Sequence, residues 1–174
     1  MNSSTASRLS TGLPSLDDLL GGGLLPGSLT VVVGATGIGN TQRGLAFAHA
    51  GLAQEGHSGV LFDMASRGDS QNHADYAGRL FDWTLTEKLA EDAALPEHVW
   101  ELEQARFDYT HIFRQSGRRV TKSDLELDDW KEWKVELSRK LQRAIAFFYG
   151  NFAHGVRRCV IDGVEPTDRA SDSW

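Results

Sequence analysis

The sequence has little of what marks a secreted or membrane-embedded protein. It contains a single cysteine, Cys159, so an internal disulfide cannot form and a reducing compartment is compatible. Its apolar runs are far shorter than the ~20 residues needed to span a bilayer. The opening stretch MNSSTAS has neither the basic region nor the apolar core of a signal peptide. We therefore expect a cytoplasmic protein that makes no membrane contact.

Basic residues are also scarce. The 18 Lys and Arg are outnumbered by 24 Asp and Glu, which gives a net charge of -6. Phosphate contacts need clustered Lys and Arg, so this charge argues against a general nucleic-acid-binding surface. A local patch, RQSGRRVTK at 114–122, leaves a contact with nucleic acid or an acidic partner open. The six histidines show no metal-ligand spacing, and one cysteine cannot build a zinc site.

The composition that remains is that of one ordinary globular domain, with 40% hydrophobic and 24% charged residues in a chain of 174. The continuous apolar run at 28–34 predicts a strand buried on both faces. Residues 40–54 predict a helix that stops at Gly56, and 58–64 predict a second buried strand. Strand, helix and strand at this spacing form a βαβ unit, so the predicted fold class is α/β with a parallel sheet.

The middle of the chain, 65–128, is less regular and is predicted to be an irregular insertion. Part of 75–89 is expected to be helical. FDYTHIF at 107–113, followed by RRVTKSD around Gly117, predicts a hairpin.

A long helix is predicted after this segment, because Ser123 and Glu126 have the spacing of a capping box. It should end near Gly150 or Gly155, and RRCVIDG then predicts a third buried strand that ends at Asp162. Apolar residues recur in the helix every three or four positions, which favours a core-facing stripe over an aromatic binding site. The stripe consists of Trp130, Trp133, Leu137, Leu141, Ile145 and Phe148.

A glycine-rich stretch between the first predicted strand and helix has the spacing of a phosphate-binding loop, G-x-x-x-x-G-K-[ST]. In such a loop, backbone N–H groups surround a phosphate and the helix N-terminus adds its positive dipole end. The hydroxyl of the last residue, Thr41, is a candidate Mg²⁺ ligand. The candidate loop consists of Gly34, Ala35, Thr36, Gly37, Ile38, Gly39, Asn40 and Thr41.

The loop lacks the lysine of that pattern, because Asn40 stands in its place. This lysine normally bridges the β- and γ-phosphates and offsets charge in the transition state. Asparagine donates a hydrogen bond but carries no charge and is shorter. Arg43 lies one turn further along, and we expect its side chain to point away from the phosphates.

Two acidic residues end predicted strands. Asp162 suits a Walker B position, where a carboxylate holds Mg²⁺ through a water, and Asp63 lies where a carboxylate could orient an attacking water. For each of them the alternative is an aspartate that caps the turn after a strand.

The stretch STGLPSLDDLLGGGLLPGSLTVVVGATGIGNT resembles the opening of the RecA-like ATPases, and especially their KaiC-like branch. The similarity covers residues 9–64 and returns at 157–168. It implies a P-loop NTPase fold over 9–174 after a flexible terminus at 1–8, with ATP as ligand, Mg²⁺ as cofactor and rings or filaments as the working form. It also places Asp63 where the family carries its catalytic glutamate.

Three departures from the family pattern qualify this expectation. Asn40 replaces the lysine, and Asp63 is one methylene shorter than glutamate, so hydrolysis should be severely slowed. The strand that separates the P-loop and Walker B strands in the family is also missing, so we expect a fold that is incomplete at its C-terminal end. Either the chain is a fragment, or its strands pair differently or with another subunit.

Three hypotheses follow from these departures. The first is an ATP-binding domain with weakened hydrolysis, regulatory or part of an assembly with itself or a related subunit. The others are a structural paralogue that binds no nucleotide, and an active ATPase whose missing lysine is replaced from elsewhere.

Overall fold

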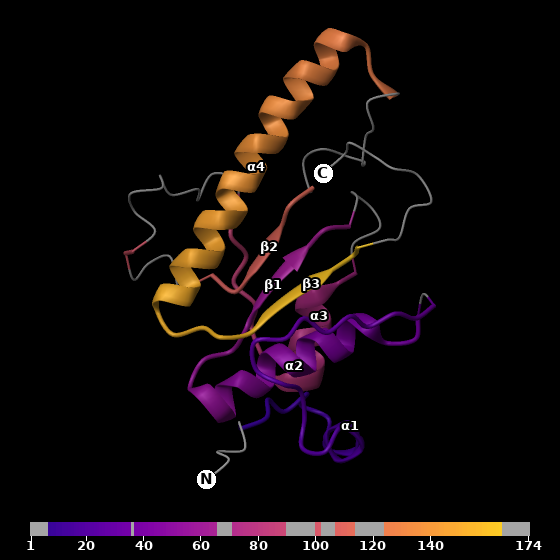
Figure 1. Ribbon diagram of the computed structural model, residues 1–174, viewed down its shortest axis with the longest axis vertical. Helices are drawn as coiled ribbons and strands as arrows, with labels where there is room; N and C mark the ends of the chain where they lie inside the picture. Colours follow the sequence, from indigo (N-terminus) through magenta and orange to yellow (C-terminus); the bar gives the residue numbers. More distant parts are fainter. Residues whose placement is uncertain are drawn as a thin grey trace, which may run out of the picture.

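The computed structural model describes residues 7–35, 37–65, 71–89, 100–101, 107–113 and 124–164. Its sheet has three parallel strands in the order β2-β1-β3. The strands are β1 (Val60–Asp63), β2 (Tyr109–His111) and β3 (Cys159–Asp162). The helices are α1 (Pro14–Leu19), α2 (Asn40–Glu55), α3 (His73–Phe81) and α4 (Leu127–Ala153). The sheet lies between α4 on one side and α2 with α3 on the other (Figure 1), which confirms the α/β class with a parallel sheet.

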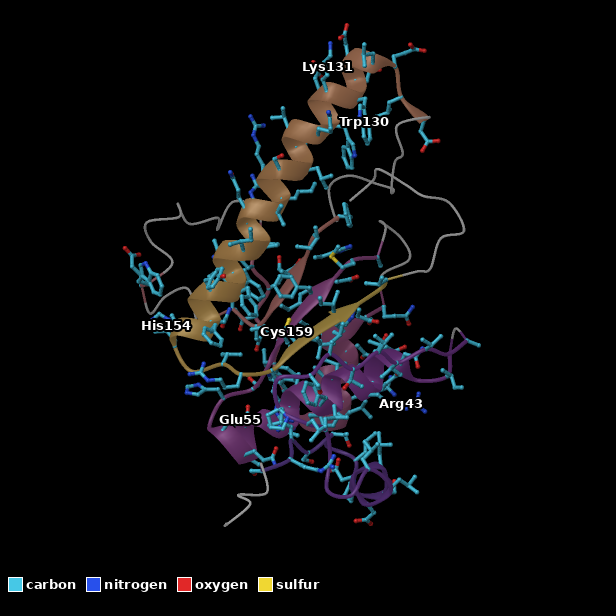
Figure 2. The ribbon with its side chains drawn as sticks, viewed as in Figure 1. Arg43, Glu55, Trp130, Lys131, His154 and Cys159 are labelled. Carbon is cyan, nitrogen blue, oxygen red and sulfur yellow. The ribbon has the colours of Figure 1, made fainter. Side chains whose placement is uncertain are left out.

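Helix α2 carries the candidate loop at its N-terminus and lies close against β3. It spans almost the residues predicted and ends at Gly56, which has the left-handed φ of 80° typical of a C-cap glycine. A Cβ at Gly44 would come within 2.8 Å of the Val160 side chain, so the backbone of α2 approaches β3 closely. Figure 2 shows Arg43 near the N-terminal end of this helix and Glu55 at the opposite end.

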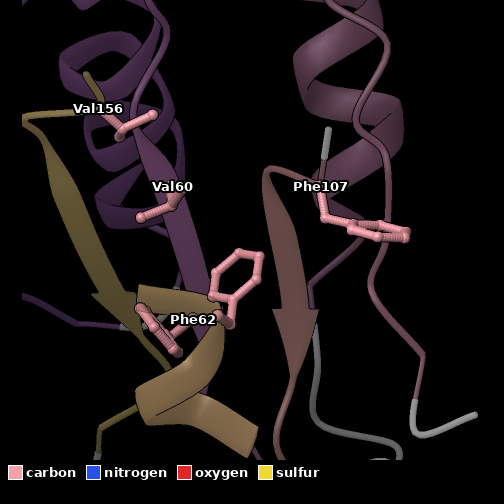
Figure 3. Packing of buried hydrophobic residues seen from close by; sticks show 5 residues of the cluster. Val60, Phe62, Phe107 and Val156 are labelled. Atoms are coloured by element: carbon pink, nitrogen blue, oxygen red, sulfur yellow. The ribbon is translucent and has the colours of Figure 1, made fainter. Parts of the chain in front are cut away.

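The central strand β1 is buried on both faces because neighbouring side chains point to opposite layers. Val60 and Phe62 point toward α4 (Figure 3). The ring of Phe62 meets the ring of Phe147 edge-on, with 5.1 Å between the ring centroids. Leu61 points the other way and packs with Leu45 of α2. The two layers of helices therefore hold the strand that ends at Asp63.

The lead-in segment before the loop is fastened to this core by polar contacts. The carboxylate of Asp17 accepts hydrogen bonds from the Ser10 hydroxyl at 2.5 Å and from the Thr11 hydroxyl and backbone N–H at 2.7 Å. The guanidinium of Arg158 is buried, pairs with Glu55 at 3.0 Å and donates to the Ser10 carbonyl at 2.6 Å. These contacts join the lead-in to α2 and to the start of β3.

The run at 28–34 is not a strand of the sheet, contrary to the prediction. Leu29 and Val33 are 88% and 84% exposed. Among the described residues, β1 is the only strand hydrogen-bonded to β3, whose outer edge therefore has no neighbour. A β-branched run becomes a strand only beside a partner strand, and no described strand lies next to it. Within the described residues, this arrangement agrees with the expectation that the intervening strand is missing.

The prediction of which face of α4 is buried is wrong for the central and C-terminal part of the helix. Trp130 is buried as expected, but Leu141 is 60% exposed and Ile145 is 46% exposed. The helix meets the sheet through Phe147 instead, with Ala144 packed beside it. Apolar residues lie on several faces of this helix, so periodicity alone could not identify the face that meets the sheet.

Other expectations for the middle of the chain have mixed outcomes. Residues 107–113 contain a strand, β2, but it pairs in parallel with β1. The expected hairpin partner around Gly117 and the capping residue Ser123 lie outside the described residues. Helix α4 is preceded by Glu126, whose side chain makes no capping hydrogen bond. None of the helices in the described ranges is long and apolar enough to cross a bilayer.

Candidate functional site

The glycine-rich loop turns sharply into the N-terminus of α2. The N–H of Ile38 donates to the Ala35 carbonyl at 3.2 Å, which closes a turn. Gly37 and Gly39 have φ values of +84° and +93°, in the left-handed region that glycine adopts at little cost. Thr36 lies outside the described residues. At Gly37 and Gly39 the described backbone therefore has the curvature that a phosphate cradle needs.

The side chain of Asn40 spans this loop. Its Nδ2 donates to the Gly34 carbonyl at 3.4 Å. A Cβ at Gly34 would lie 2.7 Å from the Ile38 side chain and 3.1 Å from Asn40 Oδ1, so a larger residue there would require these side chains to shift. The amide thus joins the first residue of the loop to the first turn of the helix.

Thr41 and Asp162 meet although 121 residues separate them in sequence. The Thr41 hydroxyl donates to Asp162 Oδ2 at 2.7 Å. Thr41 lies in the first turn of α2 and Asp162 ends β3, so the contact depends on the close packing of that helix on that strand. A hydroxyl and a carboxylate are therefore side by side at the helix N-terminus, as the two predicted Mg²⁺ ligands require.

His73 completes the surroundings of Asp162 and was not singled out by the sequence. Its Nε2 lies 2.9 Å from Asp162 Oδ2, and its Nδ1 lies 2.9 Å from the Gln71 carbonyl. Both partners are acceptors, so both contacts are hydrogen bonds only when the ring carries two protons. Burial favours the neutral acid, but the hydrogen bonds from His73 and Thr41 outweigh it and hold the pKa of Asp162 below its ordinary value.

Asp63 ends β1 beside Asp162 and is buried. Its Oδ1 accepts the N–H of Ala65 at 2.9 Å, and its Oδ2 accepts the hydroxyl of Tyr109 at 2.9 Å. His73 Nδ1 lies 3.6 Å from the same Oδ2. Both carboxylate oxygens therefore have partners within the protein, and the contact with the Ala65 N–H is that of an aspartate that caps a turn. The assignment of Asp63 as a catalytic residue stays a prediction.

The residues present partly fit Mg²⁺ and a nucleoside triphosphate. Mg²⁺ prefers oxygen ligands and keeps several waters, which suits Thr41 and Asp162 together with phosphate oxygens. Among the described residues, no group of three or more His, Cys, Asp or Glu could hold a metal ion on its own. The loop backbone has left-handed turns at Gly37 and Gly39. The cation that usually faces the phosphates is absent from position 40.

The role of His73 could not be read from spacing, yet a local signal for its position exists. Asn72 precedes it and accepts the N–H of Asp75 at 3.0 Å, so the pair marks a helix start. In a parallel sheet the segments after neighbouring strands emerge at the same edge. A helix that begins soon after β1 therefore places its first residue near the end of β3.

Comparison with known proteins identifies the family. A family model described as "ATPase: KaiC" matches residues 9–173. The circadian clock protein KaiC2 of Synechocystis sp. is 29% identical over 119 residues, which are 64% of this chain and 20% of that protein. The circadian clock oscillator protein KaiC of Prochlorococcus marinus is 32% identical over 117 residues, 66% of this chain and 23% of that protein. No solved structure gives a significant match.

The match also agrees with the geometry of the site. This chain spans about a fifth of the length of the curated relatives it matches. The family match covers residues 9–173, which include the glycine-rich loop, the helix that follows and the strand-terminal Asp162, and the Thr41 hydroxyl donates to Asp162. The chain belongs to the KaiC family of RecA-like P-loop ATPases.

Proposed function

We propose that this chain is an ATP-binding domain that holds Mg·ATP between the loop 34–41 and Asp162, with hydrolysis weakened or absent. The observation that carries the proposal is the 2.7 Å hydrogen bond between the Thr41 hydroxyl and the Asp162 carboxylate. It supports a metal position at the N-terminus of α2, where backbone N–H groups and the helix dipole also favour phosphate. Bound Mg²⁺ would offset phosphate charge, and Thr41 and Asp162 would hold it.

Weak hydrolysis is proposed because of the surroundings of Asp63. A residue that orients an attacking water needs a free carboxylate oxygen within reach of that water. Asp63 instead accepts from Ala65 and Tyr109 and is 1% exposed. Together with the missing lysine, this favours a site that binds nucleotide over one that turns it over.

An assembly with copies of itself or with a related subunit, in the cytoplasm, is the setting that we propose for this domain. The family implies it, since KaiC-like proteins self-associate. The exposed run from Leu29 to Val33 and the open edge of β3 support it, because both leave backbone groups for another strand to pair with.

Titration with Mg·ATP tests the proposal. A ligand of the native state at ten times its Kd stabilises it by about 1.4 kcal/mol, which is roughly 3–5 °C in Tm for a domain of this size. We expect such a rise, and we expect Thr41→Val and Asp162→Asn to abolish it. Phosphate release should stay near background. No rise in Tm at millimolar Mg·ATP, with no heat of binding in calorimetry, would contradict the proposal.

The second candidate is a structural paralogue that binds no nucleotide and uses the fold for contacts with other proteins. The exposure of Leu29 and Val33 favours it, since apolar side chains of this size in one run mark an interaction surface. The same titration separates the two functions. A chain that self-associates but shows no response to Mg·ATP is expected from this second candidate.

A further inference from the structure

The loop lacks a lysine, but a positive side chain lies against it. We infer that Arg43 supplies the phosphate-binding charge that position 40 lacks, and that Asn40 holds Arg43 in place for this role. The inference rests on the proposed nucleotide site and adds to it a residue outside the P-loop pattern.

The contacts of Arg43 place its guanidinium at the loop. Nη1 donates to the Ile38 carbonyl at 3.1 Å and to Asn40 Oδ1 at 3.3 Å. Figure 2 shows this side chain near the N-terminal end of α2. A long side chain one turn along a helix can reach back to the preceding residues, so Arg43 contacts the loop. The expectation that its side chain points away from the phosphates stays a prediction, and the inference opposes it.

Asn40 is chemically suited to hold both the loop and the arginine. Its amide offers a donor and an acceptor, and both are used: Nδ2 donates to the Gly34 carbonyl and Oδ1 accepts from Arg43. A lysine at position 40 could not accept a hydrogen bond and would repel a cation three residues along the helix. Asparagine therefore permits an arginine beside the loop where lysine disfavours one.

The charge of Arg43 is not neutralised within the described part of the chain. Of the ion pairs formed there, none includes Arg43, and the contacts of its guanidinium are with a carbonyl and an amide. The first turn of α2 contains no acidic residue. A cation so near a helix N-terminus opposes the helix dipole, and this cost is offset when an anion lies between them. Guanidinium groups pair in two-point fashion with phosphate oxygens, so a nucleotide phosphate is a suitable anion.

The experiment measures the Kd of Mg·ATP by isothermal titration calorimetry, with inorganic tripolyphosphate as a second ligand that isolates the phosphate chain. Arg43→Ala should raise the Kd of both ligands by at least about tenfold, which is the loss of affinity expected when a charged hydrogen bond is removed. Arg43→Lys should recover part of the affinity. Asn40→Lys combined with Arg43→Ala should restore the affinity that Arg43→Ala loses, because the charge returns at position 40.

Arg79→Ala is the matched control. Arg79 also carries its charge on a helix of this layer, but it pairs with Asp75 at 3.1 Å on an exposed surface. Its removal should leave both Kd values within twofold of the unmodified chain. Thermal unfolding without ligand should show that Arg43→Ala still folds, since the side chain is only half buried.

The outcomes separate the inference from the proposed function. If Arg43→Ala binds as tightly as Arg79→Ala, the inference is overturned while the nucleotide site stands. If the unmodified chain fails to bind but Asn40→Lys binds, Arg43 does not supply the charge and the inference is again overturned. If no variant binds either ligand, the proposed function fails and the inference fails with it.

Discussion

The contact between Thr41 and Asp162 makes a prediction about folding stability that needs no nucleotide. Thr41→Val keeps the shape of the side chain but removes the hydroxyl that donates to Asp162 Oδ2 at 2.7 Å. A hydrogen bond to a charged group contributes about 1.5–3 kcal/mol. Asp162 keeps its contact with His73 at 2.9 Å and its side chain is 22% exposed, so the lower part of this range applies. We expect Thr41→Val to lower the free energy of unfolding by about 1.5–2 kcal/mol.

A double-mutant cycle isolates this interaction. Thr41→Val, Asp162→Asn and the combination should give a coupling free energy of about 1 kcal/mol in urea unfolding followed by circular dichroism. Asp128→Asn is the control partner, because Asp128 lies at the exposed start of α4 and pairs with Lys131. Thr41→Val and Asp128→Asn should be additive.

The result that refutes the reasoning is a coupling below about 0.5 kcal/mol between Thr41 and Asp162. In that case the N-terminus of α2 and the end of β3 would not be in contact in solution. The metal position proposed between them would then have no structural basis in the free protein.

Three further predictions concern the fold. Burial raises the pKa of Asp108 to about 6 from 3.8, so its native form holds a proton more tightly than its unfolded form between those values. The free energy of unfolding of the unmodified chain, measured against that of Asp108→Asn, should therefore fall by up to about 3 kcal/mol as the pH rises from about 4 to 6. Urea unfolding of both chains at each pH measures this difference. Val60→Ala should lower the free energy of unfolding by about 1.5–3 kcal/mol, because Val60 is 2% exposed. Val31→Ala should change it by less than about 0.5 kcal/mol, because Val31 is 72% exposed. Equal effects of the two substitutions would contradict the placement of the two segments. Arg158→Met should lower the free energy of unfolding by about 3–5 kcal/mol, because it leaves the charge of Glu55 unpaired. An unchanged Tm in thermal unfolding would contradict the ion pair between Arg158 and Glu55.

Local patterns were enough to predict the elements whose structure depends on neighbours in sequence. Helix α2 follows the loop and stops at Gly56, where a left-handed residue is required. Strand β1 is central in the sheet, so the apolar run at 58–64 is covered on both faces as expected. The strand-terminal position of Asp162 was also predicted, because an acidic residue after an apolar run ends a strand in either of its possible roles.

The elements that depend on tertiary partners were not predictable in this way. The run at 28–34 has the composition of a buried strand, but without a neighbouring strand it stays outside the sheet. Cys159 and Ile161 of β3 are exposed for the same reason, although the strand was expected to be buried. His73 reaches Asp162 only because β1 and β3 are adjacent and parallel, and this pairing is not a local property of either segment.

Asn40 and Asp63, two of the three departures from the family pattern, are expected to act on different steps, and the contacts of each explain why. In the proposed site Asn40 and Arg43 would act on phosphate binding, because both contact the loop. Asp63 would act on hydrolysis, and its carboxylate accepts hydrogen bonds from Ala65 and Tyr109. Restoring lysine at position 40 together with Arg43→Ala should therefore restore nucleotide binding without producing turnover. Asp63→Glu alone should not produce turnover either, since the longer side chain would have to leave the buried contacts that Asp63 makes with Ala65 and Tyr109. The proposed binding without hydrolysis should therefore persist in both variants, and phosphate release above background from either one would contradict this reasoning.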